Sequence, residues 1–151
     1  MRRSAVLLLA ATTACTPVTS RPSFRPGPEA TQVLVVGDPA AVTRHAAAWI
    51  TQAGVRTTRT SEVDRYFETD WYRPPPDTAS AQPFPFLVKT RVWVDPGGSG
   101  RARATIETVY RPVDDPSRAA RDRERSVPAG SGADTLVRGL IAAIGEKFQI
   151  L

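Results

Sequence analysis

The sequence predicts an α+β fold, a two-layer sandwich in which an antiparallel sheet of about four strands packs against two helices. Three observations support this prediction. A short apolar run is followed by an amphipathic helix, two alternating segments flank a glycine-rich turn, and a second amphipathic helix closes the chain. Because the chain has 151 residues, it can form one globular core but not two, and we expect a single α+β domain at 31–151.

The first strand and the first helix follow each other directly. A buried strand is predicted at 32–37, where consecutive apolar residues end in glycine. A helix is predicted at 39–53, because Asp38 can cap it, Pro39 suits its first position and Gly54 can end it. Its apolar residues repeat with a helical period and form one stripe toward the core: Val42, Ala46, Trp49, Ile50 and Ala53.

Alternation of side-chain type predicts the remaining strands. We expect extended segments at 55–60 and 65–72, followed by a hairpin whose strands at 86–94 and 101–111 flank a turn at 95–100. One face of these strands is charged, so cross-strand ion pairs are expected there. Its members are Glu68, Asp70, Lys89, Arg91, Arg103 and Glu107.

Two loops and a final helix complete the predicted domain. Prolines exclude regular strand pairing at 73–85, and the polar stretch at 112–130 predicts a solvated loop. Ser131 and Asp134 then have the spacing of a capping box at the start of a helix. The strongest amphipathic stripe of the chain follows: Leu136, Val137, Leu140, Ile141, Ile144 and Phe148.

The first fifteen residues predict export. Two arginines precede an apolar run at 5–11 that is too short to span a bilayer, so 1–14 is interpreted as a removable signal. Cys15 follows Ala14 in a layout that resembles the lipobox of bacterial lipoproteins, although Thr12 stands where that family prefers Leu. The resemblance implies that Cys15 becomes the lipidated first residue. The alternatives are an ordinary secretory signal cut near Ala14 and an incidental cysteine.

The residues after the cysteine predict a spacer. The segment 15–30 contains four prolines and has no apolar periodicity, which favours an extended tether of about 3.1 Å per residue. At that rise, such a tether would hold the domain on the order of a few tens of Å from the membrane. Thr16 rather than Asp after the cysteine resembles outer-membrane sorting in Gram-negative lipoproteins, which implies an anchor at the outer membrane facing the periplasm.

Composition excludes several classes of chemistry. The chain has one histidine and one cysteine, so we expect no His/Cys metal site, no Cys–His catalytic pair and no cofactor. His45 is interpreted as a structural residue of the first helix. Loss of the two signal arginines lowers the formal charge from +5 to +3, and the arginine excess accompanies many alanines and prolines as in GC-rich genomes. We therefore expect no nucleic-acid partner.

Catalysis by carboxylates is the other enzymatic possibility. The acidic residues Glu62, Asp64, Glu68 and Asp70 lie close in sequence and could in principle supply a general acid and a general base. Their alternation on a charged sheet face opposite basic residues is more typical of cross-strand ion pairs. With no Gly-x-Ser-x-Gly motif in the chain, the sequence favours a protein that is not an enzyme.

Part of the chain resembles a family of bacterial lipoproteins. The similar stretch runs from Ala48-Trp-Ile through Gly54-Val-Arg to Tyr66-Phe-Glu-Thr-Asp-Trp-Tyr-Arg-Pro74. It resembles a pattern in lipoproteins of the BamC type, which belong to the outer-membrane protein assembly machine. The resemblance implies a helix-grip fold and lends no catalytic residues. This chain has one such domain, whereas the BamC pattern has two.

Two binding modes are compatible with these features. Trp93 and Val109 fall on the sheet face that the helices leave free, together with Arg91 and Tyr72, and such a composition is typical of a protein-binding surface for an envelope partner. The alternative for Trp93 is cover by the loop at 74–85 or by the segment 118–125. The second mode is a carrier of a small apolar ligand or lipid, since helix-grip domains can open a cavity between helix and sheet. Its lining would be Ile144, Phe148, Trp49 and the inner strand faces.

Overall fold

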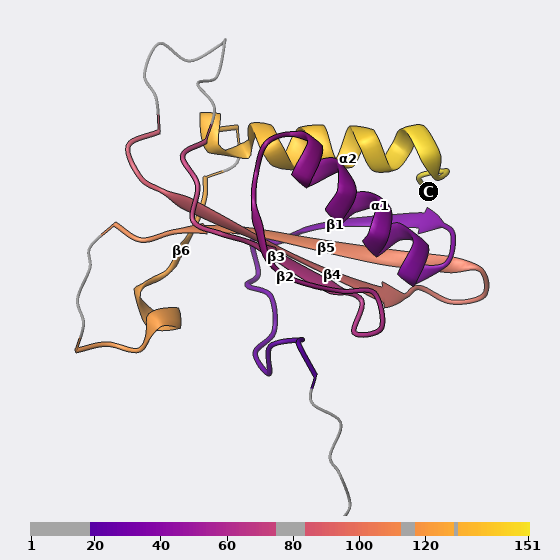
Figure 1. Cartoon of the computed structure of the whole chain (residues 1–151), viewed down its shortest axis with the longest axis horizontal. Coiled ribbons are helices and arrows are strands. Elements are labelled where there is room, and N and C mark those ends of the chain that lie inside the picture. Colours follow the sequence, from indigo (N-terminus) through magenta and orange to yellow (C-terminus); the bar gives the residue numbers. More distant parts are fainter. Residues whose placement is uncertain (1–18, 75–83, 113–116, 129) are drawn as a thin grey trace, which may run out of the picture.

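Two helices cover one face of an antiparallel sheet of six strands (Figure 1). The computed structural model describes residues 19–74, 84–112, 117–128 and 130–151. The strands are β1 (Thr31–Val36), β2 (Thr57–Ser61), β3 (Tyr66–Thr69), β4 (Val88–Pro96), β5 (Arg101–Tyr110) and β6 (Arg125–Ser126). The α-helices are α1 (Pro39–Gln52) and α2 (Thr135–Lys147), and the short 3-10 helices are η1 (Ala120–Arg123) and η2 (Gly132–Asp134). The predicted α+β class is confirmed.

The sheet has more strands than the expected four or so. Its order is β1-β5-β4-β3-β2, and β6 pairs with β5 beyond the end of β1. The predicted segment at 55–60 contributes a full strand, because β2 pairs with β3 from Thr57 to Ser61. The strand β6 lies inside the predicted loop at 112–130 and has two residues, which is too short to show alternation in the sequence.

The start of α1 follows its predicted capping. The Oδ2 atom of Asp38 accepts a hydrogen bond of 2.9 Å from the backbone N–H of Ala41, and Pro39 occupies the first helical position. After the helix, Gly54 adopts a φ of 81°, in the left-handed region that glycine tolerates best. The local signals in the sequence therefore define both ends of this helix.

The predicted capping box of α2 is wrong. The 3-10 helix Gly132–Asp134 precedes α2, so Ser131 lies a turn before the first residue of the α-helix. The Ser131 side chain makes no capping bond, and its buried Oγ has no hydrogen-bond partner among the described residues. The Oδ2 atom of Asp134 instead accepts from the backbone N–H of Gly130 and from Arg138, both at 3.3 Å.

The hydrophobic core fills the space between the sheet and the helices. It combines most of the stripes predicted for both helices with the inner faces of β1, β3, β4 and β5. The predicted core position of Ala53 is wrong, because this residue follows the last turn of α1 and is exposed. The largest fully buried members of the core include Ile50, Phe67, Ile106, Leu140 and Ile144. The partly buried Trp49, Tyr72, Ile141 and Phe148 pack against it.

The two α-helices approach each other closely at a glycine. A Cβ atom on Gly139 would lie 2.6 and 2.9 Å from ring atoms of Trp49, nearer than any non-bonded carbon contact. About one turn before Trp49 in α1, the Nε2 atom of His45 lies 2.9 Å from the carbonyl oxygen of Ala143 on α2. Small residues on α2 thus allow the side chains of α1 to reach it.

Replacing Gly139 with Ala is expected to lower the free energy of unfolding by about 1–3 kcal/mol, because the indole of Trp49 must shift out of a packed position. This loss outweighs a gain of about 1 kcal/mol in helix propensity. Gly145→Ala is the matched control on the same helix, since its Cβ would meet the side chain of Ile150, which is 44% exposed. Urea unfolding should show a lower free energy of unfolding for Gly139→Ala and a higher one for Gly145→Ala. Equal stabilities of the two variants would contradict the close contact between Gly139 and Trp49.

Two segments cover the opposite face of the sheet. Figure 1 shows residues 19–30, here called the N-terminal strap, and residues 117–127, here called the covering loop, on the side away from α1 and α2. The strap crosses the strands: Arg21 forms an ion pair of 2.7 Å with Asp95, and the backbone N–H of Gly27 donates to Glu107 at 2.8 Å.

The strap changes the interpretation of the predicted tether. Residues 19–30 pack on the sheet and belong to the folded unit. A proline-rich extended segment can cross a sheet face through backbone and side-chain contacts, although its prolines prevent regular pairing with a strand. Residues 15–18, Cys15 among them, and the predicted signal at 1–14 lie outside the described residues. No helix in the described part of the chain is long and apolar enough to cross a membrane.

Candidate functional site

The predicted solvent-facing surface around Trp93 is buried, so that prediction is wrong as to exposure. The side chains of Trp93 and Val109 are 1% and 2% exposed, and Arg91 is 6% exposed. The ring centroid of Trp93 lies 5.3 Å from that of Tyr66 and 6.2 Å from that of Phe24, a residue of the strap. The sequence alone could not show this cover, since Phe24 lies about seventy residues away in the chain.

A buried network of charges surrounds Arg91. Its Nη1 and Nη2 atoms donate to the two carboxylate oxygens of Glu124 at 2.8 Å each, and Nη1 lies 3.2 Å from Glu107. Arg121 approaches Glu107 to 2.6 Å. The side chains of Glu107 and Glu124 are each 3% exposed, so these carboxylates depend on their arginine partners.

Electrostatics and aromatic stacking reinforce each other in this network. Burial would raise the pKa of Glu124, but Arg91 and Arg121 more than offset this effect and hold the pKa below its ordinary value. The same two arginines contact the ring of Phe24, with Cζ atoms 5.2 and 4.6 Å from its centroid. The strap thus brings an aromatic ring to the two arginines of the network.

Register confirms the cross-strand part of the prediction. Arg91 stands opposite Glu68 on β3 and opposite Glu107 on β5. Sequence reasoning missed Glu124, which approaches from the covering loop, and Phe24 from the strap. The available signal for Glu124 was weak, because it is one of two acids among four arginines in a stretch without periodicity.

The four carboxylates considered for catalysis make four separate sets of contacts. Glu62 pairs with Arg44 at 2.7 Å. Glu68 accepts a hydrogen bond of 2.7 Å from the hydroxyl of Tyr66, whose pKa is raised chiefly by burial. Asp70 accepts from the backbone N–H of Trp71, and Asp64 holds the start of the strap. No two of these groups share a partner, so the arrangement does not resemble an acid/base pair.

Acid should loosen the start of the strap through Asp64. The hydroxyl and the backbone N–H of Ser20 both donate to its Oδ2 at 2.7 Å, and these bonds lower the pKa of Asp64 from 3.8 to about 2. Because the folded pKa lies below the ordinary one, this contribution is complete above pH 3.8 and is lost as the pH falls through about 2. NMR titration should show Ser20 and Asp64 changing together in this range, with Asp64→Asn abolishing the transition; a midpoint near 3.8 would contradict the contact.

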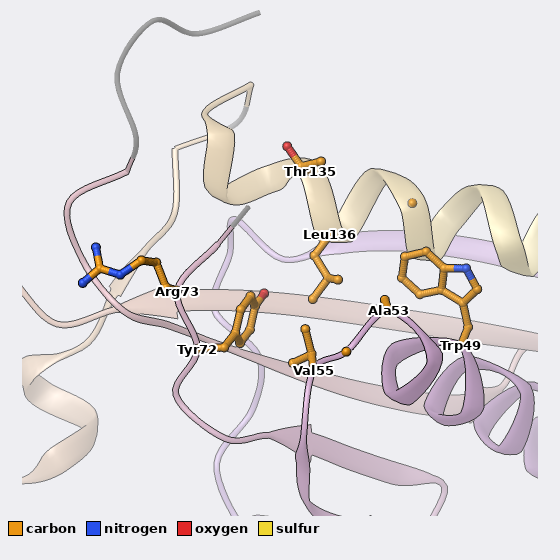
Figure 2. A pocket seen from close by; sticks show the side chains of 9 residues that line it. Trp49, Ala53, Val55, Tyr72, Arg73, Thr135 and Leu136 are labelled. Atoms are coloured by element: carbon orange, nitrogen blue, oxygen red, sulfur yellow. The ribbon is translucent and has the colours of Figure 1, made fainter. Parts of the chain in front are cut away.

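The helix layer contains a pocket at one end, which we call the helix-end pocket. It has a volume of about 420 Å³ and lies where α1 ends and α2 begins, above the chain that follows β3. Figure 2 shows Trp49, Ala53, Val55, Leu136 and Tyr72 around it. The full lining is Trp49, Ala53, Gly54, Val55, Tyr72, Arg73, Thr135, Leu136 and Gly139.

The predicted position of Tyr72 on the free sheet face beside Trp93 is wrong. Tyr72 packs against the core on the helix side of the sheet and forms the floor of the helix-end pocket. Its backbone pairs with Val88 through hydrogen bonds of 2.9 and 2.8 Å, and its hydroxyl lies 2.9 Å from Thr90. Burial raises the pKa of Tyr72 to about 12, so the ring presents a neutral surface near neutral pH. The Arg73 side chain extends away from these apolar groups (Figure 2).

The carrier cavity expected from sequence has a different lining. Trp49 does line the helix-end pocket, but Ile144 is fully buried in the core, and a Cβ on Gly37 would contact Phe148 at the opposite end of the domain. The space between helices and sheet is therefore filled by side chains along most of its length. In the described part of the chain, the space that remains for an apolar ligand lies where α1 ends and α2 begins, beside the half-buried Trp49.

A second exposed surface lies on the outer side of the same region, and we call it the Trp71–Leu87 surface. The Cζ atom of Arg111 lies 4.4 Å from the Trp71 ring centroid, and Lys89 lies 5.6 Å from it. Leu87 is 47% exposed, and the neighbouring Phe86 stacks on Tyr110. A pocket of about 390 Å³ lies here, lined by Trp71, Pro85, Phe86, Leu87 and Arg111.

Other classes of site find little support among the described residues. They contain no group of three or more His, Cys, Asp or Glu side chains placed to hold a metal ion. In comparisons with known proteins, the chain matches no family model and is significantly similar to no curated protein.

Proposed function

We propose that this chain is a lipid-anchored lipoprotein of the bacterial envelope, without enzymatic activity, that binds an apolar ligand or lipid group in the helix-end pocket. The observation that carries the proposal is the pocket itself. Its volume of about 420 Å³ lies within the range of small-molecule sites, and its lining combines apolar and aromatic side chains with few polar groups. Because Trp93 is buried, we favour this ligand-binding role over a protein-binding surface around Trp93.

The support for a lipid anchor comes from the sequence. Cys15 has the position of a lipidated cysteine, and Thr16 after it supports an outer-membrane address facing the periplasm. Replacing Cys15 with Ala in the cells of origin should move the protein from the membrane fraction to the soluble fraction. A protein that still requires detergent for its release after this change would refute the anchor.

Filling the helix-end pocket tests the binding site. Ala53 is exposed and lines the pocket, whereas the neighbouring Gln52 is exposed and does not. The fluorescence of N-phenyl-1-naphthylamine, an apolar probe, should rise on mixing with the protein, and Ala53→Trp should abolish the rise while Gln52→Trp preserves it. No response from the unaltered protein, or equal responses from the two variants, would refute the assignment.

A protein-interaction or assembly role at the Trp71–Leu87 surface is the second candidate function. An exposed leucine beside a tryptophan that carries arginine and lysine over its ring has the composition of an interface centre. A photo-crosslinking amino acid at Leu87 should capture one discrete envelope protein in intact cells. The same label at Gln52 is the control, and an identical pattern from both positions would refute this surface.

A further inference from the structure

The strap determines how far the domain can stand from a lipid attached to Cys15. Ser20 is fixed at the turn between β2 and β3, where Asp64 accepts two hydrogen bonds from it and Arg59 donates to its carbonyl oxygen at 3.2 Å. Ser20 lies five positions after Cys15 in the chain. A fully extended chain spans at most about 18 Å over five residues. The folded domain is therefore close to any membrane that holds Cys15, and not a few tens of Å away.

The strap residues that follow Ser20 line a basic groove. A groove of about 600 Å³ lies between the strap and the outer face of β5, and we call it the cationic groove. Three arginines line it, Arg21, Arg25 and Arg103, with Asp95 as its one carboxylate. The groove also includes Pro26, Gly27, Pro28, Gln32 and Thr105.

Two of these arginines are placed to bind an anionic ligand. Arg21 is engaged with Asp95 at 2.7 Å, whereas Arg25 and Arg103 are exposed and form no ion pair with a described carboxylate. The tip of the adjacent turn between β2 and β3 carries Val63, which is 90% exposed. Unpaired arginines beside an isolated exposed apolar residue are suited to a surface that offers phosphate groups over hydrocarbon.

From this arrangement we infer that the cationic groove and the turn at Val63 rest on an acidic phospholipid surface. The inference rests on the proposed function in one respect, because the anchor at Cys15 brings this part of the domain to the membrane. Arg25 and Arg103 then contact lipid phosphates, Val63 enters the interface, and the helix layer faces away from the bilayer. The helix-end pocket, on that layer, stays open to the aqueous side.

The test uses the unlipidated chain from residue 15 onward with Cys15→Ala, which contains every described residue and every contact of the fold. Its binding to phosphatidylglycerol vesicles should exceed its binding to phosphatidylcholine vesicles several-fold and should fall as salt is raised. The double variant Arg25→Glu, Arg103→Glu should weaken binding to the acidic vesicles by about tenfold, since reversal replaces attraction by repulsion.

A matched double variant controls for net charge. Arg138→Glu, Lys147→Glu makes the same charge change on exposed positions of α2 and should retain most of the vesicle binding, with thermal unfolding recorded for both variants to show that they fold. The inference is overturned if the chain binds neither vesicle or both equally, or if the two double variants bind alike. Complete competition by inorganic phosphate at constant ionic strength would also overturn it, by assigning the groove to free phosphate.

These outcomes are independent of the anchor. Because the vesicle assay uses chain without lipid, a negative result there leaves the fractionation of Cys15→Ala unaffected. Conversely, a protein that proves not to be lipidated can still be scored for its preference for acidic vesicles.

Discussion

Replacing Trp93 with Ala lowers the free energy of unfolding by about 3–5 kcal/mol, the usual cost of removing a large buried aromatic side chain. Trp93 is 1% exposed and packs between Tyr66 on β3 and Phe24 on the strap. Its removal leaves a cavity under the strap that neighbouring strands cannot close. Urea unfolding followed by circular dichroism measures the change.

Trp71→Ala is the control for this prediction. Trp71 is partly exposed on the same side of the sheet, where its ring carries Arg111 and Lys89, and its loss should cost about 1 kcal/mol. If Trp93→Ala were as stable as Trp71→Ala, the burial of Trp93 would be refuted. If Trp93→Ala abolished binding to a partner protein, the loss could not be assigned to a direct contact of Trp93 until this stability had been measured.

Replacing Arg91 with Ala is expected to destabilise the domain by about 3–5 kcal/mol as well, for an electrostatic reason. The change leaves Glu107 and Glu124, each 3% exposed, without their most buried partner. Arg121 and Arg111 remain near them but are more exposed. Adding Glu124→Gln to Arg91→Ala should restore part of the stability, because it removes one of the buried negative charges.

An exposed ion pair provides the comparison for Arg91. Arg44→Ala removes a bond of 2.7 Å to Glu62, yet both side chains are largely solvated and the expected cost is about 0–1 kcal/mol. Chemical unfolding at neutral pH measures both variants. Similar small losses for Arg91→Ala and Arg44→Ala would show that the network around Arg91 is solvated, contrary to the structure.

The sequence predicts those features that local patterns encode. Asp38, Pro39 and Gly54 give the limits of α1 because capping depends on adjacent residues. The alternation of β4 and β5 assigns each side chain to a face, and so predicts that Arg91 lies opposite Glu107. The core-facing stripes of both helices follow from the same reasoning.

The sequence could not predict the features that depend on distant contacts. Phe24 reaches Trp93, and Gly27 reaches Glu107, although no periodicity or spacing marks the strap as part of the domain. Proline content suggested a solvated spacer, but an extended proline-rich segment can be stabilised on a sheet by a few side chains. The helix-end pocket was also unpredictable in detail, since its lining comes from the ends of α1 and α2 and from Tyr72.

The crossing of the strap over the sheet has a consequence for the order of folding. A chain that emerges N-terminus first presents the strap before the residues that receive it, which lie 44, 74 and 80 positions later at Asp64, Asp95 and Glu107. The full set of contacts cannot form until Glu107 has appeared, and such long separations slow folding. The strap is therefore the first part of the described domain to be made, but it can be fixed across the sheet only after β5 has been made.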